Sequence, residues 1–210
     1  ERLTAALRFA LAQPQRVLVL FGGTDFWSNG IHLNVIESAD SPADESWRNI
    51  VAMNELTRTL IEATDRLIIA AMQGNAGAGG VFMALAADRV WARRGVVLNP
   101  HYKNMGNLYG SEYWTYLLPR RLATATASQV MRQRLPISAA QAVGLGLIDA
   151  AFGDGPEAFV ARVLERAAAL AASPDFAAML LAKRQRRETD EARKPLATYR
   201  EEELARMRRN

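Results

Sequence analysis

The sequence predicts an α/β fold, and three observations carry this prediction. Val17–Phe21 and Leu67–Met72 are continuous apolar runs, each soon followed by glycine. A helix with one apolar face separates them, and a glycine-rich turn with a short apolar helix follows the second run. Continuous rather than alternating apolar residues indicate strands covered on both faces, as in a parallel sheet. Strands that alternate with helices in this way are typical of α/β architecture.

The helix between the two runs has a recognisable start and a periodic face. Ser41 is suited to the N-cap, Pro42 to the first helical position and Asp44 to the third. Apolar side chains then recur every three or four residues and predict one buried face: Trp47, Ile50, Met53, Leu56 and Leu60. Two further short strands are expected near residues 89–91 and 96–98, and the short apolar helix at residues 81–87.

After Pro119 the pattern predicts helices throughout. Ser138 and Gln141 have the spacing of a capping box, and the glycines at 144 and 146 end that short helix. Longer helices are expected after Pro156, after Pro174 and around Leu196. We therefore divide the chain into a sheet-containing core at residues 1–135 and a helical region at residues 136–210.

Composition excludes several classes of site. The chain has no cysteine and two histidines, His32 and His101. Disulfides, thiolate metal sites and a cysteine nucleophile are excluded, and a histidine-rich metal site is not expected. No apolar run approaches the roughly 20 residues that span a bilayer. The chain starts at Glu1, inside an apolar-periodic stretch and without an initiator Met, so we expect a domain cut from a longer polypeptide.

The net charge is +4, and basic residues are concentrated near the end of the chain. Acidic residues, among them Glu201, Glu202 and Glu203, are interleaved with them. One interpretation is a solvated helix face with ion pairs at helical spacing. The other is a surface for phosphate groups, either of coenzyme A or of a nucleic acid.

Two glycine-containing turns are the best candidates for a ligand site. Residues 26–33 follow the first strand, and residues 74–80 follow the second. Ligands of α/β sheets bind outside the carboxyl ends of the parallel strands. Neither turn has the spacing of a P-loop or of a dinucleotide motif. Taken alone, glycine clusters are also compatible with tight packing of strand against helix.

The segment QGNAGAGGVFMALAAD at residues 73–88 resembles the glycine-rich turn and buried helix of the enoyl-CoA hydratase/isomerase (crotonase) family. The resemblance implies a crotonase-like ββα spiral fold, truncated at the N-terminus and followed by a helical subdomain, that binds acyl-coenzyme A. It also implies an oxyanion hole formed by the N–H groups of Ile31 and Gly79. Further substrate-binding positions carried over by the resemblance are Ser28, Gly30, His32, Gly80 and His101.

Both carboxylates of a standard hydratase are missing from the matching positions. The third residue after Gly79, a glutamate in ordinary hydratases, is Phe82. The second carboxylate is expected just after Pro100, where His101 and Tyr102 stand. Addition of water would therefore lose its general acid and base.

A narrower resemblance is carried by longer strings. GGTDFWSNGIHLN at residues 22–34, NPHYK at 99–103 and LYGSEYWTY at 108–116 look like the C-terminal domain of the HoxX family of hydrogenase maturation factors. That resemblance implies a cytoplasmic protein whose preceding formyltransferase-like domain passes a formyl group to coenzyme A. The present domain would release carbon monoxide from formyl-CoA for the [NiFe]-hydrogenase maturation machinery, with Tyr102 and Glu112 as the catalytic pair. No membrane or nucleic-acid partner is expected.

Structural interpretations of the same residues stay open. Glu112 follows Gly110 and Ser111 at an expected helix start, where the helix dipole favours an ionised acid, and could simply be a first-turn acid on an exposed helix. Tyr102 suits a half-buried aromatic position with a satisfied hydroxyl. His32 and His101 could serve only as hydrogen-bonding groups. The aromatic residues at 109, 113, 114 and 116 suit core or subunit contacts as well as a cofactor site. Two rival functions are a hydratase or isomerase with relocated catalytic groups, and a noncatalytic module that binds RNA or protein.

Overall fold

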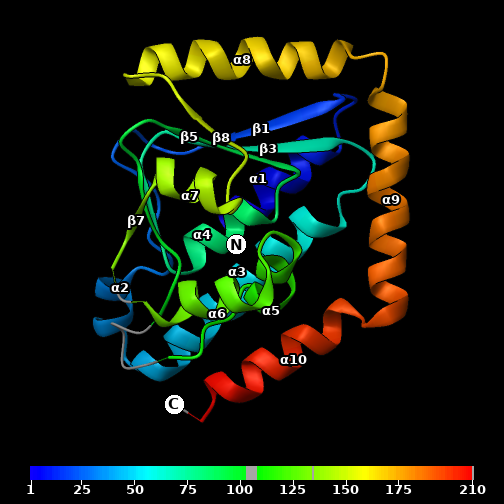
Figure 1. Cartoon of the computed structure of the whole chain (residues 1–210). Helices are drawn as coiled ribbons and strands as arrows, with labels where there is room; N and C mark the ends of the chain where they lie inside the picture. The colour runs from blue at the N-terminus through cyan, green and yellow to red at the C-terminus, as the bar shows by residue number, and fades with distance from the viewer. Residues whose placement is uncertain (103–107, 134, 210) are drawn as a thin grey trace.

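The computed structural model describes residues 1–102, 108–133 and 135–209 (Figure 1). One four-stranded sheet has the strand order β1-β3-β5-β8, and all its pairings are parallel. Its register places Val17 opposite Leu67 and Ile69 opposite Arg89. The strands are β1 (Val17–Phe21), β3 (Leu67–Met72), β5 (Arg89–Arg93) and β8 (Ala150–Phe152). Every residue of β3 is buried, as its continuous apolar sequence predicts.

Three strands of the second sheet come from the segments that follow β1, β3 and β5, and the fourth precedes β8. Its order is β2-β4-β6-β7, parallel except for the antiparallel pair of β6 and β7. The strands are β2 (Phe26–Ser28), β4 (Asn75–Gly77), β6 (Val97–Asn99) and β7 (Ile137–Ser138). The two glycine-containing segments thus pair side by side, since β2 and β4 are neighbours.

The prediction of helices throughout after Pro119 is wrong in two places. β7 and β8 are strands, and they pair with β6 and β5 of the two sheets. Strands of two or three residues are too short to show an alternating or continuous apolar pattern, so their pairing partners decide their structure. The division of the chain at residue 135 remains a prediction, although β7 and β8 join sheets that are built mostly from earlier residues.

Two aspartates connect successive strands of the first sheet in the same way. The Asp88 N–H donates to the Ile68 carbonyl, and the Ile68 N–H donates to Asp88 Oδ2 at 2.7 Å. Asp149 and Val90 repeat this reciprocal pair, with 2.6 Å from the Val90 N–H to Asp149 Oδ2. The strands β5 and β8 are thus each preceded by an aspartate that binds the neighbouring strand through the same reciprocal pair. This pair also satisfies backbone groups that strand ends would otherwise leave unpaired.

The helices enclose the sheets and meet the sequence-based expectations closely. α4 (Gly79–Leu85) is buried along its whole length, and α7 (Ala139–Leu145) begins with the predicted capping box of Ser138 and Gln141. Gly146 ends α7 in the left-handed conformation. The remaining helices before residue 150 are α1 (Arg2–Leu11), α2 (Leu33–Glu37), α3 (Pro42–Glu62), α5 (Trp114–Leu117), the 3-10 helix η1 (Leu118–Arg120) and α6 (Thr124–Arg132).

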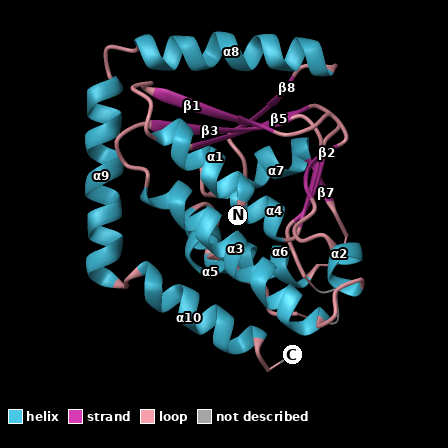
Figure 2. Cartoon of the chain, turned by 180° about the vertical axis from the view of Figure 1, so that it is seen from behind, coloured by secondary structure: helices cyan, strands magenta, loops and turns pink. Residues whose placement is uncertain are grey.

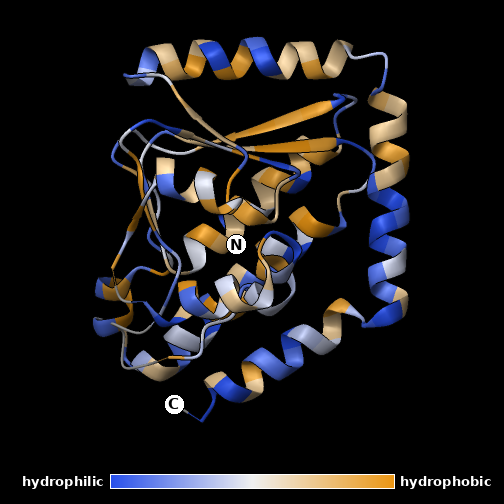
Figure 3. Ribbon diagram, in the orientation of Figure 1, coloured by the Kyte–Doolittle hydropathy of each residue, from blue (hydrophilic) through white to orange (hydrophobic). Residues whose placement is uncertain are grey.

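Three long helices frame the core at the end of the chain. α8 (Pro156–Ala172) lies along the outer face of the first sheet, α9 (Phe176–Arg193) runs down one side, and α10 (Leu196–Met207) returns beneath α5 (Figures 1 and 2). Figure 3 shows β1 and β3 as hydrophobic, whereas the middle of α9 is hydrophilic. None of the helices formed by the described residues is long and apolar enough to span a membrane.

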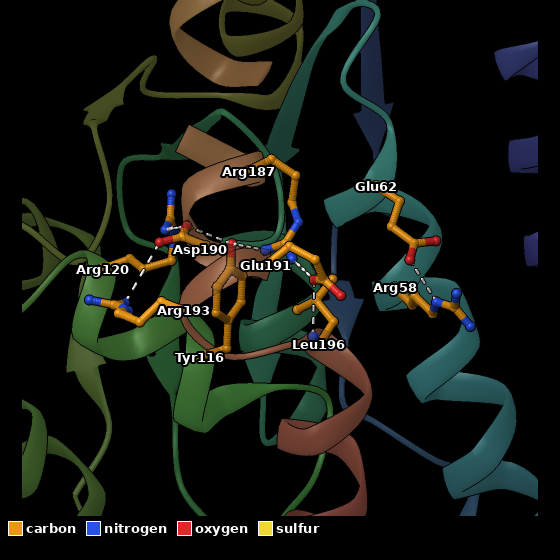
Figure 4. Close-up of polar contacts among 9 residues, drawn as sticks. All are labelled: Arg58, Glu62, Tyr116, Arg120, Arg187, Asp190, Glu191, Arg193 and Leu196. Atoms are coloured by element: carbon orange, nitrogen blue, oxygen red, sulfur yellow. Dashed lines mark hydrogen bonds and ion pairs between the residues drawn. The ribbon is translucent and has the colours of Figure 1, made fainter. Parts of the chain in front are cut away.

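Part of the late basic charge has a structural role rather than a solvated one. Lys183 of α9 is mostly buried and donates to Asp88 Oδ2 at 2.6 Å and to the Arg66 carbonyl at 2.9 Å. Further along α9, Asp190 accepts from the Tyr116 hydroxyl at 3.1 Å and pairs with Arg120 and Arg193 (Figure 4). These contacts attach α9 to the core at both ends of its polar segment.

Candidate active site

Tyr102 and Glu112, the two residues expected to be catalytic, form a buried pair. The Tyr102 hydroxyl donates to Glu112 Oε2 at 2.5 Å and lies 3.3 Å from the Ser111 carbonyl oxygen. The exposed fractions are 6% for Tyr102 and 4% for Glu112. Glu112 is therefore not the exposed first-turn acid of the structural interpretation, and the two side chains are close enough to share a proton.

The expectation that a helix dipole keeps Glu112 ionised is wrong. α5 begins two residues later and has only four residues, so its dipole is small. Burial raises the pKa of Glu112, although hydrogen bonds from Tyr102 and Ser111 partly offset this effect. Burial also raises the pKa of Tyr102 well above its ordinary value, and the neighbouring charge of Glu112 adds to the shift. Glu112 is consequently a stronger base than an exposed carboxylate, and Tyr102 remains a hydrogen-bond donor.

Phe82 fills the position of the expected hydratase carboxylate and supports Tyr102. It is completely buried in α4, and its ring stacks on that of Tyr102 with a centroid separation of 5.8 Å and an interplanar angle of 18°. The residue that replaces one acid thus positions the tyrosine of the observed pair.

Gly79 lies directly beneath the Glu112 carboxyl group. A Cβ atom at Gly79 would lie 2.7 Å from Glu112 Cδ, so a larger residue could not occupy this position without displacing the acid. Gly110 has a φ of +88°, and a Cβ there would lie 2.0 Å from Tyr102 Cε2. A Cβ at Gly30 would lie 3.9 Å from the Gly79 nitrogen, so the two glycine-containing turns lie side by side at this point. The convergence of the Ile31 and Gly79 N–H groups on one oxygen stays a prediction.

The backbone around the pair is strained. Among the described residues, the non-glycine positions with positive φ are Ala78 (46°), Glu112 (60°) and Tyr113 (59°). Ala78 directly precedes Gly79, and Glu112 is the candidate base. Such conformations cost about 1 to 3 kcal/mol each and persist where the surrounding structure holds them, which is common at functional sites.

The structure places the remaining substrate-binding candidates around the second sheet. A Cβ at Gly80 would lie 2.2 Å from the Ser28 carbonyl oxygen, and the Trp27 indole donates to the Gly80 carbonyl at 3.0 Å. His32 is exposed and its Nδ1 accepts from the Val35 N–H, so it caps α2. His101 is buried, and its backbone N–H donates to the Asn99 carbonyl. Lys103 of the longer motif lies outside the described residues.

A cavity of about 620 Å³ lies beside Tyr102. Tyr102 is the one predicted site residue among its described lining residues, and Tyr109 and Trp114 form aromatic walls. The other two aromatic residues of that group, Tyr113 and Tyr116, belong to the core. Three arginines also line it: Arg132, Arg206 and Arg209. Within the described ranges, no group of three His, Cys, Asp or Glu side chains could hold a metal ion.

Sequence reasoning missed one residue of the site, Glu203. The sequence places it among the interleaved acids of a solvated helix face, but it is completely buried on α10. Its carboxyl group accepts hydrogen bonds from the N–H groups of Tyr113 and Thr115, beside Glu112. No local pattern distinguishes it from Glu201 and Glu202, because only the packing of α10 against α5 buries it.

A model of the enoyl-CoA hydratase/isomerase family matches residues 1–207. The chain belongs to this family. Solved crotonase structures agree: an enoyl-CoA hydratase from Bacillus halodurans superimposes with a TM-score of 0.82, over 98% of this chain and 81% of that one, at 20% identity. At that identity the likeness supports the fold alone. The predicted crotonase-like α/β fold is confirmed.

More similar family members identify a narrower group. The hydrogenase maturation factor HoxX of Bradyrhizobium diazoefficiens is 56% identical over 210 residues, which are all of this chain and 37% of HoxX. The crystal structure of HypX from Aquifex aeolicus in complex with tetrahydrofolic acid superimposes with a TM-score of 0.94 at 48% identity, over 98% of this chain and 36% of HypX. The chain is thus a crotonase domain of the HoxX/HypX type and spans little more than a third of these relatives.

Proposed function

We propose that this domain binds formyl-CoA and releases carbon monoxide for the maturation of [NiFe]-hydrogenase. The observation that carries the proposal is the buried Tyr102–Glu112 pair beside Gly79, together with Phe82 at the position of the hydratase glutamate. A formyltransferase-like domain of the same protein would supply the formyl group. Tetrahydrofolic acid, bound in the HypX crystal, is a one-carbon carrier and fits such a supply.

The reaction needs one proton transfer and no redox partner. The formyl C–H and C–S bonds of the thioester break, and an S–H bond forms. The carbon keeps one electron pair and leaves as carbon monoxide, while coenzyme A leaves as the thiol. A single base that takes the formyl proton and returns it to sulfur is sufficient, and we assign that role to Glu112.

The residues around Glu112 would have distinct tasks. A thioester oxygen bound by the Gly79 and Ile31 N–H groups would bring the formyl carbon next to the carboxyl group, because Glu112 Cδ lies so close to Gly79. Tyr102 orients Glu112 Oε2 through its short hydrogen bond. The raised pKa of Glu112 suits a base that must pass its proton on.

The cavity beside Tyr102 is the place we assign to part of the coenzyme. Its apolar and aromatic walls suit the pantetheine arm, and Arg132, Arg206 and Arg209 supply positive charge for phosphate groups. Arg206 already donates to the Tyr109 hydroxyl at 2.7 Å, so its guanidinium is held at the cavity wall.

Three assays on the protein expressed from its complete gene separate this proposal from its rivals. Calorimetry measures coenzyme A binding, with AMP as the control ligand, and a haem reporter measures carbon monoxide released from formyl-CoA. Hydration of crotonyl-CoA is followed in parallel. We expect coenzyme A binding and carbon monoxide release without hydration. Hydration without carbon monoxide would favour an altered hydratase, and absence of all three signals would favour a noncatalytic binding module.

A further inference from the structure

Glu203 is a buried carboxyl group that accepts three hydrogen bonds from the segment that carries Glu112. Its Oε2 accepts from the Tyr113 N–H at 2.9 Å. Its Oε1 accepts from the Thr115 N–H at 2.8 Å and from the Thr115 hydroxyl at 2.5 Å. One side chain of α10 thus binds three donors within three residues of the turn.

These contacts fix a backbone conformation that the turn would not keep by itself. Glu112 and Tyr113 both have left-handed φ values, which are unfavourable for residues other than glycine. The Tyr113 N–H belongs to the peptide group that joins the two residues. Its hydrogen bond to Glu203 therefore sets the orientation of that peptide, and with it the direction in which the Glu112 side chain leaves the backbone.

The need to pack α10 against the core does not by itself explain why Glu203 is buried. Burial of a carboxyl group is costly, and apolar residues hold helices together at lower cost. Leu196 already packs α10 into the core, and the pair of Asp190 with Arg120 attaches the preceding α9 (Figure 4). The acid is placed where backbone N–H groups need an acceptor.

We propose that Glu203 is the positioning residue of the Tyr102–Glu112 pair. Its carboxyl group holds the Glu112–Tyr113 turn and so keeps Glu112 over Gly79 and within hydrogen-bond reach of Tyr102. This inference rests on the proposed function. A displacement of about 1 Å at a catalytic group can cost on the order of 10²-fold in rate, so a loosened turn should have a clear kinetic effect.

The test compares Glu203→Gln with Asp190→Asn in the protein expressed from its complete gene. Both changes replace a buried carboxyl group by an amide of the same size near the end of the chain. Asp190, however, binds the side chains of Tyr116, Arg120 and Arg193, whereas Glu203 binds the backbone N–H groups of the turn. For Glu203→Gln we expect kcat for carbon monoxide release to fall at least about tenfold, with KM and coenzyme A affinity within a few-fold. We expect Asp190→Asn to keep the parental kcat.

A double variant separates positioning from general loss of structure. In a Glu112→Gln background there is no base to position, so Glu203→Gln should lower the rate no further. A variant that merely unfolds part of the protein would lower both rates by the same factor. If Glu203→Gln does not fold, Glu203→Asp, which keeps the carboxyl group but shortens its reach, replaces it.

Hydrogen exchange gives a readout that does not depend on turnover. Exchange of the Tyr113 and Thr115 amides should accelerate at least about tenfold in Glu203→Gln and stay unchanged in Asp190→Asn. Absence of carbon monoxide release by the parent would refute the proposed function, and exchange would then decide whether Glu203 holds the turn. Unchanged exchange, or an unchanged kcat in an active parent, would overturn the positioning role.

Discussion

The Phe82 ring lies nearly parallel to the Tyr102 ring, with 5.8 Å between their centroids. Phe82, at the position where an ordinary hydratase has an acid, thus contacts Tyr102 of the proposed catalytic pair. The Phe82 ring is completely buried and can neither donate nor accept a proton, so it contributes to the packing of the site and not to acid–base catalysis. The site thus differs from a hydratase in more than a missing carboxylate.

We predict that Phe82→Glu does not produce an efficient hydratase. The new acid would be buried without a partner and mostly protonated, and the second hydratase position is still His101 or Tyr102. Crotonyl-CoA hydration measures the outcome, with circular dichroism as the control for folding. Turnover at ordinary hydratase rates in this single variant would show that one residue separates the two activities.

Gly79→Ala should disrupt the pair without removing any of its groups. The new Cβ would lie 2.7 Å from Glu112 Cδ, so the carboxyl group must move. We expect carbon monoxide release to fall at least about tenfold. Gly144→Ala is the matched control, because its Cβ points into open space within α7, and it should raise stability by about 0.4 to 1 kcal/mol. Equal activities of the two variants would contradict the proposed proximity of Gly79 and Glu112.

The proposed oxyanion hole makes a geometric prediction. If the N–H groups of Ile31 and Gly79 bind one thioester oxygen, each nitrogen must lie about 2.9 Å from it, and the two nitrogens within roughly 6 Å of each other. A crystal structure with a bound acyl-CoA or its analogue measures both distances. A separation above about 10 Å would exclude a shared acceptor.

Stability should depend on pH through the buried acids. Burial raises the pKa of Glu203 from 4.5 to about 8, and the charge of Glu112 contributes in the same direction. The folded state therefore keeps a proton that the unfolded state releases, so this group's stabilisation is lost progressively as pH rises from about 4.5 to about 8. Urea unfolding between pH 5 and pH 9 should show a flatter profile in Glu203→Gln. Identical slopes in parent and variant would refute the shifted pKa.

The sequence was sufficient for much of the fold because its signals were local. Continuous apolar strands, the Ser41 and Pro42 helix start and the Ser138 capping box each act within a few residues, and each is found in the structure. β7 and β8 escaped prediction because their strand conformation comes from pairing with β6 and β5, which are distant in sequence.

The site likewise contains residues that local motifs indicate and residues that only tertiary packing determines. Tyr102, Glu112 and Gly79 could be proposed from motifs, and the structure brings these three together. The chemistry of Glu112 could not be read from its helix-start motif, because burial rather than a dipole governs its pKa. Glu203 gave no signal at all, since its burial depends on how α10 packs against α5.

Carbon monoxide formation by Tyr102→Phe and Glu112→Gln, in the protein expressed from its complete gene, tests the central claim most directly. Loss of a positioned acid or base typically costs about 10²- to 10⁴-fold, so each variant should lower release from formyl-CoA at least about tenfold. Coenzyme A affinity should stay within a few-fold in both. Release at the parental rate in both variants would contradict the catalytic assignment and leave Tyr102 and Glu112 with structural roles only.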